Sequence, residues 1–268
     1  MTDLEKMTSK YIEEGYSELL AEARVCQDIV LKAISESTMK NNVTIKGGIV
    51  MRSITGNVRR ATRDMDFDFI RYSIDEKSIR EFIEKLNCLE GISIQISGPI
   101  EELSQQEYRG KRVWVVIQDE TGHSYKSKMD LGVHKNTQIE QDEYCFDICN
   151  DDEGVSLLMN SREQVFAEKL RALVKFGTFS GRVKDVFDLC YLTNHLDSDR
   201  LMQCINTYII DDPDMFENNI NDVKNRVSKV FSDKEFAKTV DKSRRDNWLG
   251  VKASAAFKII QDFLQELH

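Results

Sequence analysis

The chain has 268 residues, of which 41% are apolar and 31% are charged, and its formal net charge at pH 7 is −9. This composition is sufficient to build a large hydrophobic core in one domain or two. No apolar run approaches the length of a membrane span, and the N-terminal stretch MTDLEKMTSKYIEEGY is too charged for a signal peptide. We therefore expect a cytoplasmic protein with no membrane contact. The acidic balance also disfavours extensive binding along nucleic acid, but it leaves room for a local contact.

The six cysteines and four histidines are scattered along the chain, without a C-x-x-C pair. This pattern argues against a disulfide framework and against a structural zinc site. We therefore expect Cys145 and Cys149 to be ordinary thiols.

The first half of the chain alternates between helical and strand periodicity. Residues 4–35 carry apolar side chains at helical spacing, and a short strand then ends at Lys46-Gly47-Gly48, before a helical stretch and a turn. After this turn the patterns predict an acidic strand, a helix and three further strands. In chain order, these elements are expected at 64–72, 74–89, 92–97, 113–118 and 125–133.

From about residue 160 the strand pattern gives way to helical periodicity, and Ser161 with Gln164 forms a capping-box pattern. The expected helices span 161–176, 183–194, 198–210, 216–231 and 252–267. The polar segment NDDEG favours a connector near residues 150–160. We therefore predict an α+β protein with two subdomains that meet at a cleft: residues 1–155 form a mixed sheet with flanking helices, and residues 156–268 are all helical.

The stretch RRATRDMDFDF sets Asp64, Asp66 and Asp68 on one face of an expected strand and three apolar residues on the other. Carboxylates about 7 Å apart on one strand face repel each other unless cations lie between them. A solvated strand face is the commoner explanation of a lone D-x-D. A site for divalent metal ions is the sharper hypothesis, and it needs support from other segments.

Two further segments of the first half give that support. Gly47 and Gly48, between a strand and a helical turn, would offer backbone N–H groups and a helix N-terminus to phosphates. In the strand expected at 125–133, Lys128 and Asp130 share one face. Asp130 is therefore a candidate third carboxylate, because two-metal transfer of a nucleotidyl group needs carboxylates on neighbouring strands.

In the helical half, AEKLRALVKF contains Glu168 and Lys169, and SGRVKDVFDLCYL places Asp185 and Asp188 on one helix side. These charges either mark the exposed edge of a bundle or face the cleft. In the second case Lys169 would hold a triphosphate as a point charge. Arg182 and Asp185 would then order the cleft wall or contact the second substrate.

Taken in order, KGGIVMRSITGNVRRATRDMDFDF, SKMDLGVHK, EQVFAEKLRAL and GRVKDVFDLCYL resemble the four motifs of the AbiEii/AbiGii-type nucleotidyltransferase toxins. That family belongs to the DNA polymerase β-like nucleotidyltransferase superfamily, and the resemblance spans residues 44–192. It implies a minimal nucleotidyltransferase core that uses a nucleoside triphosphate with Mg²⁺ or Mn²⁺. It also implies a cognate antitoxin, because such proteins are typically toxins of toxin–antitoxin or abortive phage-infection systems.

The resemblance also implies roles for individual residues. The metals would be bound by Asp64, Asp66 and Asp130. The nucleotide would be bound by Lys46, Gly47, Gly48, Arg60, Lys128, Lys169 and Arg182. Lys169 and Asp185 would join the three metal-binding aspartates as catalytic residues, with Glu168 and Asp188 as their motif neighbours. Asp68 would be an outer or surface group.

One position departs from the family pattern. Members often carry a hydroxyl residue directly after the glycines, where this chain has Ile49. Backbone amides would then have to suffice, or Ser53 or Thr55 would contact the phosphate. The segment before Asp64 is also long, and its arginines (59, 60 and 63) would reach phosphates of the nucleotide or of an RNA acceptor.

The sequence therefore predicts an Mg²⁺-dependent enzyme that moves a nucleoside monophosphate from a nucleoside triphosphate to an acceptor hydroxyl. On family grounds a tRNA 3′ end is the favoured acceptor, and a protein hydroxyl is the second. The alternative is a degenerate module that binds nucleotide or a partner without turnover. Ile49 favours this alternative, whereas retention of Asp64 and Asp66 argues against it. A metal-dependent phosphohydrolase would need His-Asp clusters, which the sequence lacks.

Overall fold

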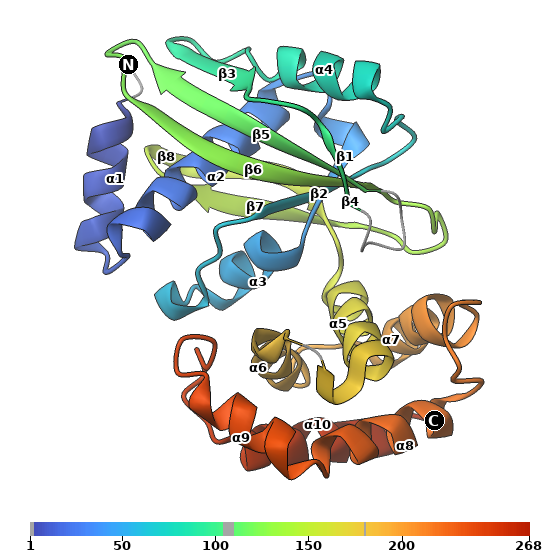
Figure 1. Ribbon diagram of the computed structural model, residues 1–268. Helices are drawn as coiled ribbons and strands as arrows, with labels where there is room; N and C mark the ends of the chain where they lie inside the picture. Colours follow the sequence, from blue (N-terminus) through green and yellow to red (C-terminus); the bar gives the residue numbers. More distant parts are fainter. Residues whose placement is uncertain (1–2, 104–109, 180) are drawn as a thin grey trace. The chain divides into compact units, whose positions relative to one another are not determined.

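The structure is a computed structural model that describes residues 3–103, 110–179 and 181–268. The chain divides into two compact units, Met1–Asn160 and Ser161–His268. The first unit contains a mixed sheet with helices and the second is helical, so the predicted α+β class is confirmed (Figure 1). The division falls after Asn160, whereas the predicted boundary at residue 155 lies inside a strand.

The first unit begins with two helices and then alternates strands with short helices. Its helices are α1 (Leu4–Glu13), α2 (Glu18–Glu36), α3 (Gly47–Thr55) and α4 (Glu76–Lys85), with 3-10 turns at Lys40–Asn42 and Val58–Arg60. Its strands are β1 (Val43–Lys46), β2 (Met65–Phe69), β3 (Ile92–Ile96), β4 (Glu101–Leu103), β5 (Gly110–Asp119), β6 (Ser124–Val133), β7 (Asp142–Ile148) and β8 (Asp151–Met159).

These strands form one sheet in the order β3-β5-β6-β2-β1-β8-β7, with β4 paired to β5. The acidic strand β2 lies at its centre, antiparallel to β1 and parallel to β6. It is shorter than predicted: it ends at Phe69, and Arg71 has a positive φ of 51°. β1, which leads into the glycine motif, and β6, which carries Asp130, therefore lie on either side of β2.

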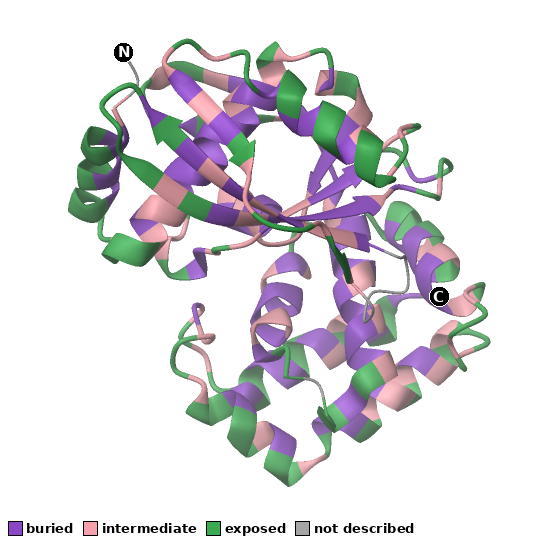
Figure 2. Cartoon of the chain, turned by 45° about the horizontal axis from the view of Figure 1, so that its top comes forward, coloured by how far each residue is buried: buried purple, intermediate pink, exposed green. Residues whose placement is uncertain are grey.

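The apolar face of the sheet is covered by α2 and α4. Phe67 and Phe69 of β2 are fully buried, and the Phe69 ring meets that of Phe82 in α4 edge to face, with 5.0 Å between centroids. The Cys88 thiol, just after α4, donates to the Ala33 carbonyl of α2, so the chain that leaves α4 contacts α2. Figure 2 shows the buried residues on the strands and on one side of these helices. The period-two pattern thus selects which face of β2 is buried.

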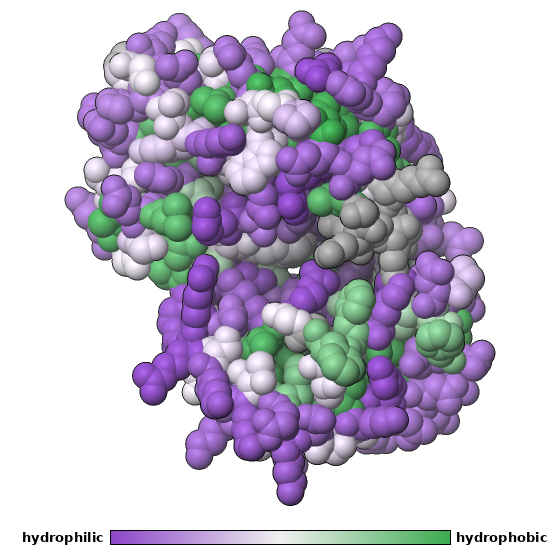
Figure 3. Space-filling model, in the orientation of Figure 1, coloured by the Kyte–Doolittle hydropathy of each residue, from purple (hydrophilic) through white to green (hydrophobic). Residues whose placement is uncertain are grey.

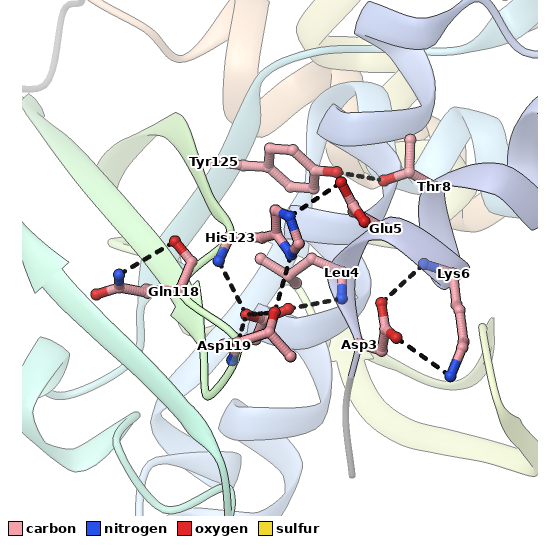
Figure 4. Close-up of polar contacts among 11 residues, drawn as sticks. Asp3, Leu4, Glu5, Lys6, Thr8, Gln118, Asp119, His123 and Tyr125 are labelled. Atoms are coloured by element: carbon pink, nitrogen blue, oxygen red, sulfur yellow. Dashed lines mark hydrogen bonds and ion pairs between the residues drawn. The ribbon is translucent and has the colours of Figure 1, made fainter.

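Helix α1 is tied to the turn between β5 and β6 (Figure 4). The Asp119 carboxylate accepts the backbone N–H of Leu4 at 3.0 Å, and it also accepts the N–H groups of Thr121 and His123. The hydroxyls of Thr8 and Tyr125 are 2.9 Å apart. One carboxylate therefore satisfies both the start of a helix and a hairpin turn, and backbone hydrogen bonds contribute to lowering its pKa.

The segment predicted as a connector is a β-hairpin, and this prediction is wrong. β7 and β8 pair antiparallel, and Asn150 at the turn has a positive φ of 62°. β8 also pairs in parallel with β1, so the hairpin adds two strands to the sheet. The polar letters NDDEG mark the turn region of this hairpin, because Asn and Asp favour turns as well as linkers.

The second unit is built only from helices in the part of the chain that the structure describes. They are α5 (Arg162–Phe176), α6 (Val183–Leu192), α7 (Ser198–Ile205), α8 (Ile220–Phe231), α9 (Lys234–Lys242) and α10 (Ala253–Glu266), with a 3-10 turn at Gly177–Phe179 and a π-turn at Asn206–Ile210. The predicted cap is present, because the Ser161 hydroxyl accepts the Gln164 N–H at 3.1 Å. Helix α9, which is capped by Asp233, was not predicted from the sequence.

The surface of the molecule is mainly hydrophilic in the view of Figure 3, with apolar side chains in small groups. Among the residues described, the most exposed large apolar side chains are those of Phe179 and Phe216 in the second unit. Among the helices described, none has both the length and the apolar character of a membrane span. All six cysteines are free thiols.

Candidate active site

Four charged residues form a row across the centre of the sheet, on the face opposite the core of α2 and α4. Strand register places Lys46 of β1 beside Asp66 of β2, Asp66 beside Asp130 of β6, and Asp130 beside Arg112 of β5. Paired residues of neighbouring strands point to the same face. Asp66 and Asp130 are therefore direct neighbours, and a cation flanks them on each side.

The row ends at the glycine turn predicted to hold phosphates. Gly47 is the first residue of α3 and has a positive φ of 62°, which a residue with a side chain rarely adopts. A Cβ atom at Gly47 would lie 2.3 Å from the Asp66 Oδ2. The glycine thus lets a carboxylate reach the start of α3, where the Gly48 N–H hydrogen bonds to it. The Asp66 carboxylate therefore already accepts a hydrogen bond from a backbone N–H group that would bind a phosphate.

Asp66 has an unusual pKa. The pKa of its carboxyl group is raised to about 6, mainly by burial and also by the charges of Asp130 and Asp64, whereas Lys46 and the Gly48 N–H act to lower it. Mutual repulsion of the three aspartates is therefore a physical property of this site. A carboxylate in this environment gains from a bound cation.

The other aspartates are neutralised by cations of the protein itself. The Asp64 carboxylate lies 3.1 Å from the Lys128 ammonium. Arg112 holds Asp130 with two parallel hydrogen bonds, from Nε at 2.7 Å and from Nη2 at 2.8 Å. Lysine and arginine side chains of neighbouring strands thus neutralise these two aspartates in this structure, and binding of Mg²⁺ by them stays a prediction.

Of the two roles predicted for Asp68, an outer group behind the metal ligands or a surface group, the structure excludes the second. Asp68 is 6% exposed, and Lys46 pairs with it at 2.9 Å. A Cβ atom at Gly132 of β6 would lie 2.1 Å from the Asp68 Oδ1, so this glycine makes room for the carboxylate. The sequence signal for this arrangement was the lysine before the glycines, whose reach to Asp68 depends on the antiparallel pairing of β1 with β2.

The donors of this face fit a hard divalent cation in kind, because Asp64, Asp66 and Asp130 offer oxygen ligands from neighbouring strands. Their present side-chain positions are those of ion pairs. Within residues 3–103, 110–179 and 181–268, no group of three or more His, Cys, Asp or Glu side chains could hold a metal ion as placed. Binding would require Lys128 and Arg112 to release their partners.

Thr62, which was not predicted as a site residue, lies beside the glycine turn. Its hydroxyl lies against the glycine turn, because a Cβ atom at Gly48 would meet the Thr62 Oγ1 at 2.4 Å. Ile49, by contrast, is fully buried. Thr55 is also engaged elsewhere, since its hydroxyl donates to the Arg52 carbonyl at the end of α3. The hydroxyl next to the glycines therefore comes from the segment before β2, and only the fold reveals it.

The arginines before β2 have different environments. Arg60 is 3% exposed, and its place in the 3-10 turn puts it inside the first unit, whereas Arg59 and Arg63 are exposed. A contact from Arg60 to a nucleotide, as predicted, would require the buried side chain to be reached from the site.

In the helical unit, the third and fourth motifs meet in a buried ion cluster. The Lys169 ammonium of α5 lies 2.6 Å from Asp185 and 2.8 Å from Asp188, both on α6. Asp188 is fully buried and also accepts the Trp248 indole N–H at 2.9 Å. The exposed Arg182 pairs with Asp185 at 3.1 Å. Helical spacing correctly places both aspartates on one side of α6, and Glu168 instead accepts a hydrogen bond from Gln164.

Comparison with solved structures supports the fold. The crystal structure described as "putative nucleotidyltransferase from H. pylori" matches 93% of this chain and 94% of its own, with a TM-score of 0.52 and 15% identity. An antigenic nucleotidyltransferase-like protein from Paracoccidioides brasiliensis covers 88% of this chain and 96% of its own, at 13% identity. Its TM-score of 0.43 is too low to support a common fold. No curated protein matches the sequence.

A family model identifies the chain more directly. The model for "Nucleotidyl transferase AbiEii toxin, Type IV TA system" matches residues 29–258, which include all four motifs and both units. The match covers most of the chain, and the resemblance drawn from the motifs is confirmed. The protein belongs to the AbiEii family of toxins from type IV toxin–antitoxin systems, and it is a nucleotidyltransferase.

Proposed function

We propose that the protein transfers a nucleoside monophosphate from a nucleoside triphosphate to the terminal hydroxyl of an RNA, with a tRNA 3′ end as the favoured acceptor. Family membership supports the nucleoside triphosphate as substrate and an antitoxin as genetic partner. The observation that carries the proposal is the pairing of Asp66 with Asp130 beside the Gly47-Gly48 turn. Carboxylates next to a phosphate-binding turn are the arrangement that metal-assisted nucleotidyl transfer needs.

Asp64, Asp66 and Asp130 would hold Mg²⁺, or Mn²⁺ in its place. When bound, the cation would neutralise charge on the triphosphate and polarise the phosphorus that is attacked. The protein would supply the remaining electrostatics. The N–H groups at the start of α3 would bind phosphate oxygens, with the Thr62 hydroxyl next to them. Lys128 and Arg112, once released from their aspartates, would turn to the phosphates.

Lys169 and Asp185 keep their proposed catalytic roles on one condition. Asp188 is fully buried and hydrogen bonded to Trp248, so it cannot turn outward. For Lys169 to hold a triphosphate, its ammonium would therefore exchange Asp185 for a phosphate oxygen. Arg182 is already paired with Asp185 and would keep that carboxylate neutralised during the exchange.

The choice of RNA as acceptor is supported by Arg59 and Arg63, which are exposed in the segment that leads into β2. A few arginines near the site suit a short contact with an RNA end. They do not suit binding along a duplex, since the net charge of the chain is −9.

The test uses each α-labelled nucleoside triphosphate with Mg²⁺ and either total RNA or total protein. We expect label on RNA with the wild-type chain. The double variant Asp64→Asn/Asp66→Asn should lose about a hundredfold or more of the rate, because two charged ligands become neutral. Asp152→Asn, an exposed aspartate of β8, is the matched control and should keep full activity. Label only on protein would refute the RNA acceptor, and label that persists in the double variant would refute the metal site.

A further inference from the structure

A polar cavity of about 230 Å³ lies in the first unit, between the ends of α1 and α3 and the strand β7. None of the aspartates of the charged row and neither glycine of the turn lines it. Its wall includes three tyrosines and two arginines: Tyr11, Tyr16, Tyr144, Arg24 and Arg52. Ser53, next to Arg52 on α3, completes the polar lining.

Arg24 and Arg52 both have buried guanidinium nitrogens without a hydrogen-bond partner among the described residues, but Arg24 has a carboxylate at ion-pair distance and Arg52 has none there. Arg52 is 6% exposed, and its Nε and Nη2 atoms are buried with no hydrogen-bond partner among the described residues. The Ser53 hydroxyl is buried next to it, likewise without a partner in the described part of the chain. A buried guanidinium without a counter-charge is rare, because arginine keeps its proton and charge even when it is buried.

The two unpaired atoms of Arg52, Nε and Nη2, lie along one edge of the guanidinium group. Arg112 uses the same two atoms, Nε and Nη2, to grip both oxygens of Asp130. Arg80 uses the same pair on Glu76. This edge is the fork that fits a carboxylate or phosphate with two parallel hydrogen bonds. In Arg52 the two atoms of this edge are unpaired within the described part of the chain, and the residue lines the cavity.

The charges around Arg52 favour an anion there. The second buried arginine, Arg24, already lies 3.3 Å from Asp28, so its charge is balanced. Lys10, Glu14 and Asp147 are exposed side chains of the wall, where water screens them. Among the described residues that line the cavity, the buried charge left without a counter-charge is therefore that of Arg52.

We propose that this cavity is a binding site for a small phosphate-bearing molecule, held by the Arg52 fork and the Ser53 hydroxyl. A phosphate group matches the two fork donors and keeps further oxygens for the hydroxyl, whereas a carboxylate would have to accept all three hydrogen bonds on its two oxygens. A cavity of about 230 Å³ holds a phosphate with a small attached group. Free phosphate and the phosphate of a nucleoside monophosphate share this chemistry. The site is separate from the aspartate row and does not depend on the proposed transfer reaction.

The test is calorimetric titration of the full chain in EDTA, so that metal-dependent nucleotide binding does not contribute. The probes are inorganic phosphate, adenosine monophosphate and acetate. We expect saturable binding of phosphate, of the monophosphate, or of both, and much weaker binding of acetate. Tighter binding of the monophosphate would identify a nucleotide as the source, and equal binding would identify free phosphate. Arg52→Lys keeps the charge but not the fork, and it should weaken binding about tenfold or more.

Two further variants and one control complete the design. Arg52→Met should abolish phosphate binding and raise the melting temperature of the ligand-free protein, because an unpaired buried charge is removed. Ser53→Ala should weaken binding by a smaller factor. Arg80→Gln, which breaks an exposed pair on α4, should change neither. The double variant Asp64→Asn/Asp66→Asn should still bind phosphate, which separates this site from the proposed active site.

Three results would overturn the proposal. The first is equal phosphate binding, or none, by the wild type and Arg52→Met. The second is a lower melting temperature of ligand-free Arg52→Met, because it would show that the guanidinium has partners within the fold. The third is a crystal soaked in phosphate that contains only water at the Arg52 fork, since water is the ordinary occupant of a polar cavity.

Discussion

The two units carry buried charges in different ways. In the helical unit, Lys169 lies between Asp185 and Asp188, and Trp248 donates to the fully buried Asp188. In the sheet unit, Asp66 sits beside Asp130 and has its pKa raised to about 6 by burial and by neighbouring negative charge. The first cluster is satisfied by its own members, whereas the second carries repulsion that a cation or proton relieves.

This difference separates two roles that look alike in the sequence. A D-x-D on a strand and a D-x-x-D on a helix both read as acidic motifs. Where the fold supplies counter-charges at close range, removing one carboxylate leaves a buried cation with less counter-charge than the fold provides, and this is destabilising. Where the fold places carboxylates close together, removing one relieves electrostatic repulsion, so the substitution should stabilise the fold and lower the activity instead. The same substitution, Asp→Asn, should therefore act with opposite sign in the two units.

The largest effect on stability is expected for Asp188→Asn. It leaves Lys169 with a single carboxylate partner in a buried site, so unfolding of the helical unit should become easier by about 3 kcal/mol. The two tryptophans of the chain, Trp114 and Trp248, lie in different units. Urea unfolding followed by Trp248 fluorescence in a Trp114→Phe background would measure the change in the helical unit alone.

The control for this prediction is Asp199→Asn, an exposed aspartate of α7 that should leave the midpoint unchanged. A shift of Asp188→Asn no larger than that of the control would mean that the cluster contributes little. The comparison between the units would then fail.

The next effect is the opposite response of Asp66→Asn in metal-free protein. The carboxyl group has an ordinary pKa of 3.8 and a folded-state pKa of about 6, so the folded chain binds the proton more tightly. The free energy of unfolding of the wild type therefore falls as pH rises from about 4 to about 6, and it stays lower above that range. Asp66→Asn should remove this loss and stabilise the sheet unit by at most roughly 3 kcal/mol at pH 8.

This prediction is checked by urea unfolding at several pH values in EDTA, with Trp114 as the reporter in a Trp248→Phe background. The Asp66→Asn variant should keep part of the pH dependence of the wild type, because burial also raises the pKa of Asp28 to about 6. An Asp66→Asn chain that is less stable than wild type at pH 8 would show that the carboxylate has a favourable partner in the apo state.

A smaller effect is expected at the glycine turn. Gly47→Ala should destabilise the chain by about 1–3 kcal/mol, because alanine is strained at a φ of 62° and its Cβ would displace Asp66. Gly56→Ala is a matched control, since Gly56 has a φ of 59° and nothing lies within 4 Å of the added atom. Thermal denaturation measures both, and their difference isolates the clash with Asp66. Equal losses would mean that the carboxylate moves aside freely.

The smallest effect is expected for Lys128→Gln. Its partner Asp64 is 47% exposed, so the ion pair is screened by water and should contribute at most about 1 kcal/mol to stability. The transfer rate should nevertheless fall if Lys128 turns to the phosphates as proposed. A kinetic assay at saturating Mg²⁺ with the same labelled substrates distinguishes the two consequences, and an unchanged rate would remove Lys128 from the proposed site.

Much of the site could be predicted from local sequence. The alternation of Asp64, Met65, Asp66 and Phe67 places the carboxylates on one face because strand side chains alternate, and the spacing of Asp185 and Asp188 puts both on one side of a helix. The hairpin of β7 and β8 was missed because its turn residues also suit a linker. Thr62 was missed because its contact with Gly48 depends on how the segment before β2 returns over α3.

The sequence by itself determined which side chains share a face, since that depends only on the period of each element. The four ordered motifs also determined the family. Only the tertiary structure decided which charges meet: the register of β1, β2, β6 and β5 sets Lys46, Asp66, Asp130 and Arg112 in one row. The same is true of Arg52, because only the fold shows that its buried Nε and Nη2 atoms have no partner among the described residues. Pairing between distant segments is fixed by packing and strand register, and no local pattern encodes it.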